Sequence, residues 1–273
     1  MQNFGIMSVF KRSAMVPFQN IKGLLGTIGL TAVLYFIIFA IMALVFAGAI
    51  TVEDMMSGDP AAFADLFSGV SAGAMIIGIL SVWIFAVVGM TLIFNYWVRH
   101  AALGEGRGLT EWGEVFSSAL TNGLKFIGVG IVIVIAAMIF GVLFGMVFAA
   151  LGLVDLDAMQ DPTAISGGMI GMQVLMVAGI CVVYAVMSAS LTRTALGSDA
   201  VEVKNARTND FAAVLMMIYV PVIILSAVLP VMLGVVLGLI LSMVLSLWST
   251  VAIAAAHGVR HQRCVEMEAV PTE

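Results

Sequence analysis

The chain has 273 residues, of which 62% are hydrophobic and only 10% carry a charge. Soluble domains have about 45–50% apolar and about 25% charged residues, so this composition provides too little polar surface for a water-soluble globule of this size. It excludes an ordinary soluble enzyme, a secreted disulfide scaffold and a disordered protein, and it favours a polytopic helical membrane protein.

Uncharged segments long enough to cross a membrane recur along the chain. A helix needs about 20 apolar residues to span a hydrocarbon core about 30 Å thick. The last uncharged stretch, Phe211–Ala256, is too long for one span, and Pro230 followed by Gly234 predicts a tight hairpin turn within it. We therefore predict an all-α fold, a single membrane domain over residues 1–273. Its six transmembrane helices are expected at about residues 24–50, 72–98, 126–153, 167–192, 211–229 and 231–256.

The charged residues are divided unequally between the two ends of these spans. All eleven Lys and Arg residues fall in four segments that a six-span topology places on one face. The two loops of the opposite face, residues 51–71 and 154–166, contain seven carboxylates and no basic residue. Because Lys and Arg are retained on the cytoplasmic side, we expect a multi-pass protein of the bacterial cytoplasmic (inner) membrane with both termini in the cytoplasm. The first apolar stretch is too long for a signal-peptide core, which predicts that the first span is retained.

Polar or amphipathic segments precede each pair of spans. The segment Leu109–Leu124 has apolar residues at helical spacing with Ser, Thr, Asn and Glu between them, and Ser198–Arg207 has a charged face but a weaker apolar stripe. The first such stripe consists of Phe4, Met7, Phe10, Ala14 and Phe18. We predict a threefold repeat in which a cytoplasmic amphipathic lead-in helix precedes a pair of transmembrane helices. These lead-in helices either lie in the plane of the lipid headgroups or pack on the bundle as loop helices.

The order of three polar segments along the chain is similar to that in a known group of proteins. The segments are the lead-in Ser8–Arg12, the amphipathic segment Trp112–Leu124, and Gly197–Asp210 before the closing hairpin. In this layout the chain resembles bacterial inner-membrane proteins of uncharacterised role that share a fold with the membrane domain attached to some glycerophosphodiester phosphodiesterases. The resemblance covers most of the chain and implies a six-span membrane module. No phosphodiesterase domain is attached in this sequence, so the resemblance supplies no catalytic residue.

The residues that could perform chemistry are few. His257, His261 and Cys264 would share a helix face, but Arg260 and Arg263 alternate with them and no acidic fourth ligand is placed with them, so we interpret them as a solvated basic tail. The spans contain hydroxyl groups without a neighbouring His, Asp, Glu or Lys, which predicts no catalytic residue. We expect no enzymatic activity, no metal and no cofactor. The absence of charge within the spans also disfavours proton-coupled transport.

Two further predictions concern the tryptophans near the span ends and the glycines that lie four residues apart. Trp97 and Trp112 are expected at the cytoplasmic membrane interface. The paired glycines are expected to permit close helix contact. They are Gly69 and Gly73, Gly141 and Gly145, Gly167 and Gly171, and Gly234 and Gly238.

These observations predict a non-enzymatic membrane module that acts in interaction or envelope support. Its expected partners are the bilayer and anionic phospholipid headgroups, with a membrane-protein partner or a homo-oligomer as open alternatives and no nucleic acid. The residues expected to contact headgroups are Lys11, Arg12, Lys22, Arg107, Trp112, Lys125, Lys204 and Arg207. The alternative is a small-solute transporter or channel without intramembrane charge coupling. A water-lined cavity in mid-membrane flanked by Ser188, Tyr184, Asn95 or Ser246 would indicate that alternative.

Overall fold

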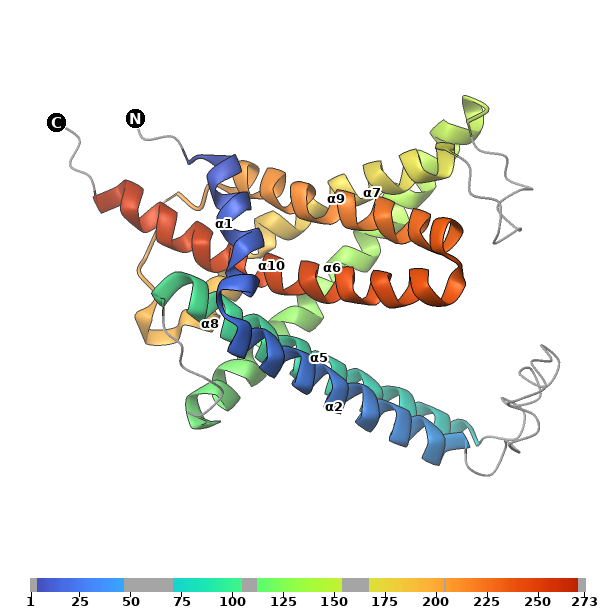
Figure 1. The fold of residues 1–273 in the computed structure, drawn as a ribbon, viewed down its shortest axis with the longest axis horizontal. Helices are drawn as coiled ribbons and strands as arrows, with labels where there is room; N and C mark the ends of the chain where they lie inside the picture. Colours follow the sequence, from blue (N-terminus) through green and yellow to red (C-terminus); the bar gives the residue numbers. More distant parts are fainter. Residues whose placement is uncertain (1–3, 47–70, 105–111, 154–166, 204, 270–273) are drawn as a thin grey trace.

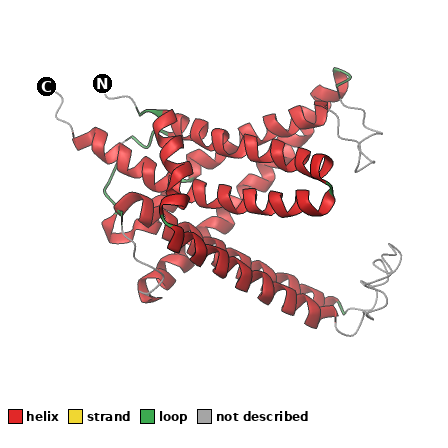
Figure 2. Ribbon diagram, in the orientation of Figure 1, coloured by secondary structure: helices red, strands yellow, loops and turns green. Residues whose placement is uncertain are grey.

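The computed structural model describes residues 4–46, 71–104, 112–153, 167–203 and 205–269. Over these residues the chain is helical and contains no strand (Figure 2). Six of the described helices are long and apolar enough to cross a membrane, judged by length and composition. The predicted all-α polytopic membrane fold is therefore confirmed.

The helices follow one another as three pairs, α2 with α5, α6 with α7, and α9 with α10, whose members pack against each other (Figure 1). Their bounds are α1 (Ile6–Gln19), α2 (Ile21–Phe46), α5 (Ala72–Leu103), α6 (Trp112–Ala150), α7 (Gly167–Met187), α8 (Ala189–Leu196), the 3₁₀ helix η2 (Gly197–Asp199), α9 (Thr208–Leu233) and α10 (Val235–Ala269). The helix α1, the helix α8 and the C-terminal parts of α5 and α10 lie together at one end of the bundle. We call this end the basic end, because the described Lys and Arg residues belong to segments located there.

The helices match the predicted spans with shifts at their ends. Helix α2 begins three residues before the predicted start, and the predicted end of the first span, residues 47–50, lies outside the described part of the chain. Helix α10 continues to Ala269, well past the predicted end. The closing hairpin turns at Gly234, whose φ of 80° is favourable only for glycine, whereas Pro230 lies inside α9. A Cβ on Gly238 would overlap the backbone of Pro230, so the two helices of this hairpin meet closely beside the turn.

The three predicted lead-in segments take three different forms. The first is a separate helix, α1, and Asn20 between α1 and α2 accepts a hydrogen bond from the backbone N–H of Gly23 at 2.9 Å. The second is continuous with its span, since α6 runs from Trp112 to Ala150 without a break. The third prediction is wrong as a helix, because the residues described between η2 and α9, 200–203 and 205–207, are irregular. The weak apolar stripe of that segment explains the difference, since it offers no continuous face to bury.

The hydrophobic core lies towards the basic end. Its members there include Trp97 and Val98 of α5, Phe211 and Leu215 of α9, and the row Val251–Ala256 of α10. Farther along the spans, large apolar side chains face outward, and α2 and α5 diverge from α9 and α10 (Figure 1). An apolar exterior of this extent is characteristic of helices that are surrounded by lipid.

The predicted glycines permit close helix contact only in part. Gly238 lies against the backbone of Pro230, and a Cβ on Gly171 would meet the Phe148 ring at 3.3 Å, but Gly141 and Gly145 have no atom within 4 Å of where a Cβ would be, so the prediction is wrong for that pair. A tight crossing that was not predicted is at Gly258 of α10, where a Cβ would overlap the carbonyl oxygen of Val98 in α5. Gly69 lies outside the described residues. The prediction failed for Gly141 and Gly145 because glycine four residues from glycine marks one helix face without indicating whether a partner helix covers it.

Candidate functional site

A buried amide pair joins α5 to α6 at the basic end. Asn122 Nδ2 donates to Asn95 Oδ1 at 2.6 Å and is 3.2 Å from the carbonyl oxygen of Leu191 in α8. Asn95 Nδ2 donates in turn to Ser118 Oγ at 3.3 Å. Within the amphipathic segment, the polar residue Asn122 therefore points inward, and the apolar residue Leu120 is exposed. In a lipid environment polar side chains find partners between helices, while apolar ones face the acyl chains.

His257 is fully buried and hydrogen-bonded on both sides of its ring. Its Nδ1 lies 2.8 Å from Thr192 Oγ1, and its Nε2 lies 3.1 Å from the hydroxyl of Tyr184. Hydroxyl groups can donate or accept, so the two partners suit an imidazole that has one donor and one acceptor nitrogen. The rings of Phe94 and Phe211 pack edge-on against the imidazole, with centroids 4.9 and 4.8 Å away.

Arg260, one turn beyond His257, is 3% exposed. Its NH1 donates to Ser188 Oγ at 3.3 Å, and its guanidinium carbon lies 4.2 Å from the centre of the Phe211 ring. Among the described residues, no carboxylate forms an ion pair with Arg260. A cation–π contact and one neutral hydrogen bond therefore hold a buried guanidinium that has further N–H donors.

These positions correct the interpretation of His257, His261 and Cys264 as a solvated tail. His257 and Cys264 are buried and His261 is half-buried, because α10 continues past Ala256 and packs against α1, α5 and α9. No group of three or more His, Cys, Asp or Glu side chains in the described residues could hold a metal ion. The sequence contains one indication of this packing, because small side chains permit close helix contact. The small residues are Ala252, Ala254–Ala256 and Gly258.

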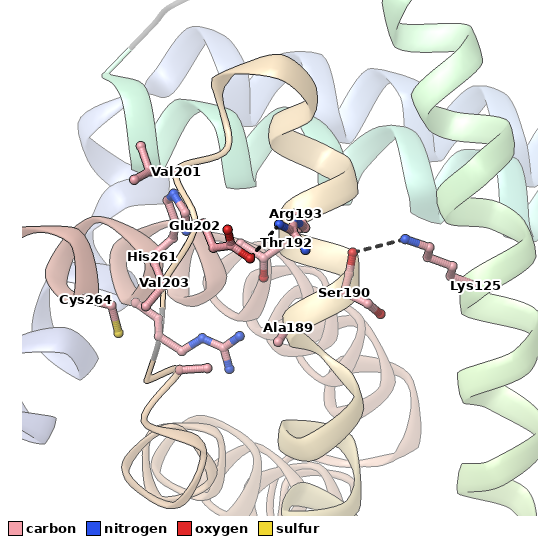
Figure 3. Close-up of a pocket in the computed structure, with 12 residues that line it drawn as sticks. Lys125, Ala189, Ser190, Thr192, Arg193, Val201, Glu202, Val203, His261 and Cys264 are labelled. Atoms are coloured by element: carbon pink, nitrogen blue, oxygen red, sulfur yellow. Dashed lines mark hydrogen bonds and ion pairs between the residues drawn. The ribbon is translucent and has the colours of Figure 1, made fainter. Parts of the chain in front are cut away.

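A cavity of about 400 Å³ opens beside Arg260 (Figure 3). It lies among α6, α8, α10 and the irregular segment that follows η2. Its polar lining consists of Lys125, Ser190, Thr192, Arg193, Glu202, Arg260 and His261, and its apolar lining includes Ala189, Val201, Val203 and Ala206. Figure 3 shows Lys125 reaching from α6 toward Ser190, and the ion pair between Arg193 and Glu202.

The structure places the predicted headgroup-contacting residues in different settings. Lys11, Arg12 and Lys22 are exposed on α1 and at the start of α2. Lys125 is half-buried, and its Nζ donates to the Ser190 carbonyl oxygen at 3.4 Å and to Thr194 Oγ1. Arg207 is half-buried just before α9. The residues Arg107 and Lys204 and the side chain of Trp112 lie outside the described part.

Trp97, which was expected at the membrane interface, is instead buried in the core. Its indole N–H donates to Thr27 Oγ1 in α2 at 2.9 Å. The interface prediction for Trp97 is therefore wrong. A tryptophan near a span end suits an inter-helix contact as well as an interface, provided that its N–H finds an acceptor.

Helix α1 has two contrasting faces. Val9, Ser13 and Val16 are buried where α1 packs against α9 and α10. On another face Met7, Met15 and Phe18 are between 51% and 55% exposed, next to the exposed Lys11. We call Met7, Lys11, Met15 and Phe18 the α1 outer face. Two of the predicted apolar residues, Met7 and Phe18, thus belong to the outer face and not to the face that covers the bundle.

Two further cavities lie farther from the basic end. One, of about 350 Å³, is enclosed by α5, α6, α7, α9 and α10 and is mainly apolar, with Tyr184 and Tyr219 in its lining. The other, of about 420 Å³, lies among α2, α5 and α10 and includes Ser246. Of the four residues named as signs of a transport cavity, Tyr184 and Ser246 therefore line cavities. Asn95 is instead hydrogen-bonded to Ser118, and Ser188 to the carbonyl oxygen of Ala185.

Comparison with known proteins gives no match to a family model, to a curated protein or to a solved structure.

Proposed function

We propose that this protein is a non-enzymatic module of the bacterial cytoplasmic membrane, whose basic end faces the cytoplasm and binds anionic phospholipid headgroups. In this proposal the six spans hold the module in the bilayer, and α1 attaches its cytoplasmic end to the membrane surface. The module would support the envelope or present a surface to a membrane-protein partner or to a second copy of the chain.

The observation that carries the proposal is the α1 outer face. If α1 served only to cover the bundle, its apolar residues would be buried against the other helices. Met7, Met15 and Phe18 are exposed instead. An exposed apolar face beside Lys and Arg is the combination that binds at the headgroup boundary, through apolar burial and attraction to anionic lipid. Lys11 and Arg12 beside this face, and Lys22 at the start of α2, would each contribute about 1 kcal/mol near an anionic surface.

The non-enzymatic part of the proposal is supported by the chemistry of the buried cluster. The imidazole of His257 has two hydroxyl partners, Thr192 and Tyr184. The second ring nitrogen of His257 is hydrogen-bonded to Tyr184 and not to a carboxylate that would orient a catalytic base. This pattern suits a structural link among α7, α8 and α10.

The position of α1 can be tested with an environment-sensitive fluorophore on the intact protein. Cys181 and Cys264 are first replaced by Ala, and a single cysteine is then introduced as Met15→Cys on the outer face or as Ala269→Cys, which is also exposed but lies at the C-terminal end of α10. In nanodiscs that contain phosphatidylglycerol, we expect blue-shifted emission at position 15 and water-like emission at position 269. Water-like emission at both positions would contradict the proposal.

The contribution of charge is tested on the same labelled protein. Replacing phosphatidylglycerol with phosphatidylcholine, or introducing Lys11→Gln together with Arg12→Gln, should reduce the blue shift at position 15. High salt should act in the same direction, because exposed charges are screened. An emission spectrum that is insensitive to lipid charge, salt and these substitutions would limit the interaction to apolar burial.

Transport of a small solute is the second candidate, and the two mainly apolar cavities between helix pairs favour it. Proteoliposomes that contain the protein should then show faster uptake of small neutral solutes than protein-free liposomes. Ser246→Phe, which would fill the cavity among α2, α5 and α10, should reduce that uptake. Uptake equal to that of protein-free liposomes would exclude these solutes as substrates.

A further inference from the structure

The cavity beside Arg260 differs from the α1 outer face in location and in construction. It is a concave site among α6, α8 and α10, and Arg260, Lys125 and Arg193 contribute cationic groups to its lining. Figure 3 shows Lys125 and Arg193 from α6 and α8. Glu202 is the one carboxylate among the cavity-lining residues of the described chain. The cavity therefore has an excess of positive charge.

The hydrogen-bond and ion-pair partners of the three cationic side chains show which of them lack a negative partner. Arg193 is paired with Glu202 at 3.3 Å, and both side chains are mostly exposed. Within the described residues, Lys125 donates to the neutral oxygens of Ser190 and Thr194. Arg260 has Ser188 and the Phe211 ring as its contacts, again without a negative charge. Two cations, one of them almost completely buried, thus line the cavity without a compensating carboxylate among the described residues.

A buried guanidinium in this state is unusual. Burial of a charge is unfavourable unless the charge is paired, and arginine presents several N–H donors in a planar fork, of which Ser188 accepts one bond. An oxyanion with several acceptor oxygens can bind such a fork through two parallel hydrogen bonds. Lys125 lines the same cavity and adds a second positive charge to it.

We propose that this cavity binds the phosphate group of an organic ligand, with Arg260 as its hydrogen-bonding contact and Lys125 as a second positive charge in the lining. A phosphate suits the site better than a carboxylate, because its higher negative charge matches two cations and its additional oxygens can accept from the remaining N–H groups of the guanidinium. The apolar lining from Val201, Val203 and Ala206 would contact the organic part of the ligand. That ligand is either the headgroup of a phospholipid or a soluble phosphorylated compound.

Two probes distinguish these sources on the full-length protein in an uncharged detergent. Calorimetric titration with inorganic phosphate, against chloride at matched ionic strength, tests a free phosphate group. Titration with dihexanoyl phosphatidic acid, against dihexanoyl glycerol, tests the same group on a lipid backbone. Saturable binding of both probes supports a general phosphate site. Binding of phosphatidic acid alone assigns the site to a lipid headgroup, and binding of inorganic phosphate alone assigns it to a soluble ligand.

Substitutions locate the binding in the cavity. Arg260→Gln should weaken binding about tenfold or more, because it removes a charge-assisted hydrogen bond. Lys125→Gln should weaken binding about fivefold, because it removes a positive charge from the cavity lining. Arg263→Gln is the matched control: Arg263 is on the same helix and pairs with Glu266, outside the cavity, and its substitution should change affinity less than about twofold. If Arg260→Gln does not fold, the proposal is tested with Lys125→Gln, because Lys125 is only half-buried.

The proposal is overturned if the folded wild-type protein binds neither probe saturably, or if Lys125→Gln binds as tightly as the wild type. An equal loss in Arg263→Gln would also overturn it, since the effect would then reflect net charge alone. These outcomes do not depend on the proposed function, because the α1 outer face is separate from the cavity and the Lys11→Gln, Arg12→Gln variant should bind phosphate normally.

Discussion

Gly258 in α10 lies directly against Val98 in α5, so close that a Cβ on Gly258 would overlap the Val98 carbonyl oxygen. The same Cβ would also meet the side chain of Ala101 at 2.8 Å and the backbone nitrogen of Ala102 at 2.9 Å. The obstacle is largely backbone, so it cannot move aside as a flexible side chain could. Gly258 therefore sets how closely α5 and α10 approach at the basic end, next to His257 and Arg260.

Gly258→Leu should separate these two helices and destabilise the protein. Overpacking of a close contact costs about 1–3 kcal/mol, and here the displaced atoms belong to the backbone of α5. We expect a lower thermal unfolding temperature in detergent and a smaller folded fraction. Gly141→Leu is the control, because the space around Gly141 is open, and it should unfold like the wild type. Equal stability of both variants would contradict the close contact.

The Asn95–Asn122 pair should show coupling in a double-mutant cycle. Asn95→Ala and Asn122→Ala each remove one side of the 2.6 Å hydrogen bond, so the double variant should lose less than the sum of the single losses. Hydrogen bonds between membrane helices are worth about 0.6 to 1.7 kcal/mol, and the coupling energy is expected in that range. Unfolding by a denaturing detergent measures it. Additive losses would show that the two amides do not interact.

Replacement of His257 should affect stability more than replacement of its neighbour on α10. His257→Leu leaves the buried hydroxyls of Thr192 and Tyr184 without their ring partner, at a cost of about 1–3 kcal/mol. His261→Leu, at a half-buried position, should shift stability by about 0.5 kcal/mol or less. Thermal unfolding of the two variants provides the comparison. A stable His257→Leu protein would mean that the hydroxyls find other partners.

Arg99 should hold α8 and η2 in place. Its guanidinium donates to the Leu196 carbonyl oxygen at 3.1 Å and to Asp199 at 2.9 Å, so that the C-terminal end of α8 is tied to α5. Arg99→Ala should increase amide hydrogen exchange in residues 196–203. Arg193→Ala, which breaks the more exposed pair with Glu202, should change that exchange little, because exposed ion pairs contribute about 0–1 kcal/mol. Unchanged exchange in Arg99→Ala would contradict this role.

The orientation expected from the charges can be tested with topology reporters. Alkaline phosphatase, which is active only outside the cytoplasm, should be inactive when fused after Glu273 and active when inserted within residues 51–71. The reason is that Lys and Arg are confined to the segments on the side of the termini. Introducing several Lys residues into 51–71 should reduce the activity of the loop fusion. An active C-terminal fusion would reverse the assigned orientation.

Several side-chain positions could not be derived from the sequence. The polar face of the Leu109–Leu124 segment was recognised, but only the packing of α6 against α5 and α8 shows that Asn122 points inward to Asn95. Trp97 was expected at the interface and is buried on Thr27. Arg260 was assigned to a solvated tail because the uncharged stretch ends at Ala256, whereas α10 continues to Ala269 and carries Arg260 into the core.

The sequence by itself determined the all-α fold class and the six spans, and it carries the charge asymmetry from which the orientation is predicted. These properties follow from length, hydrophobicity and net charge along the chain, since the bilayer acts as a layered solvent that each segment meets separately. Only the tertiary structure decided which face of each helix is covered, and so which polar groups meet. The contacts of His257 with Thr192 and Tyr184 join residues far apart in the chain. Such contacts depend on the tilt and rotation of whole helices, which packing at positions such as Gly258 sets.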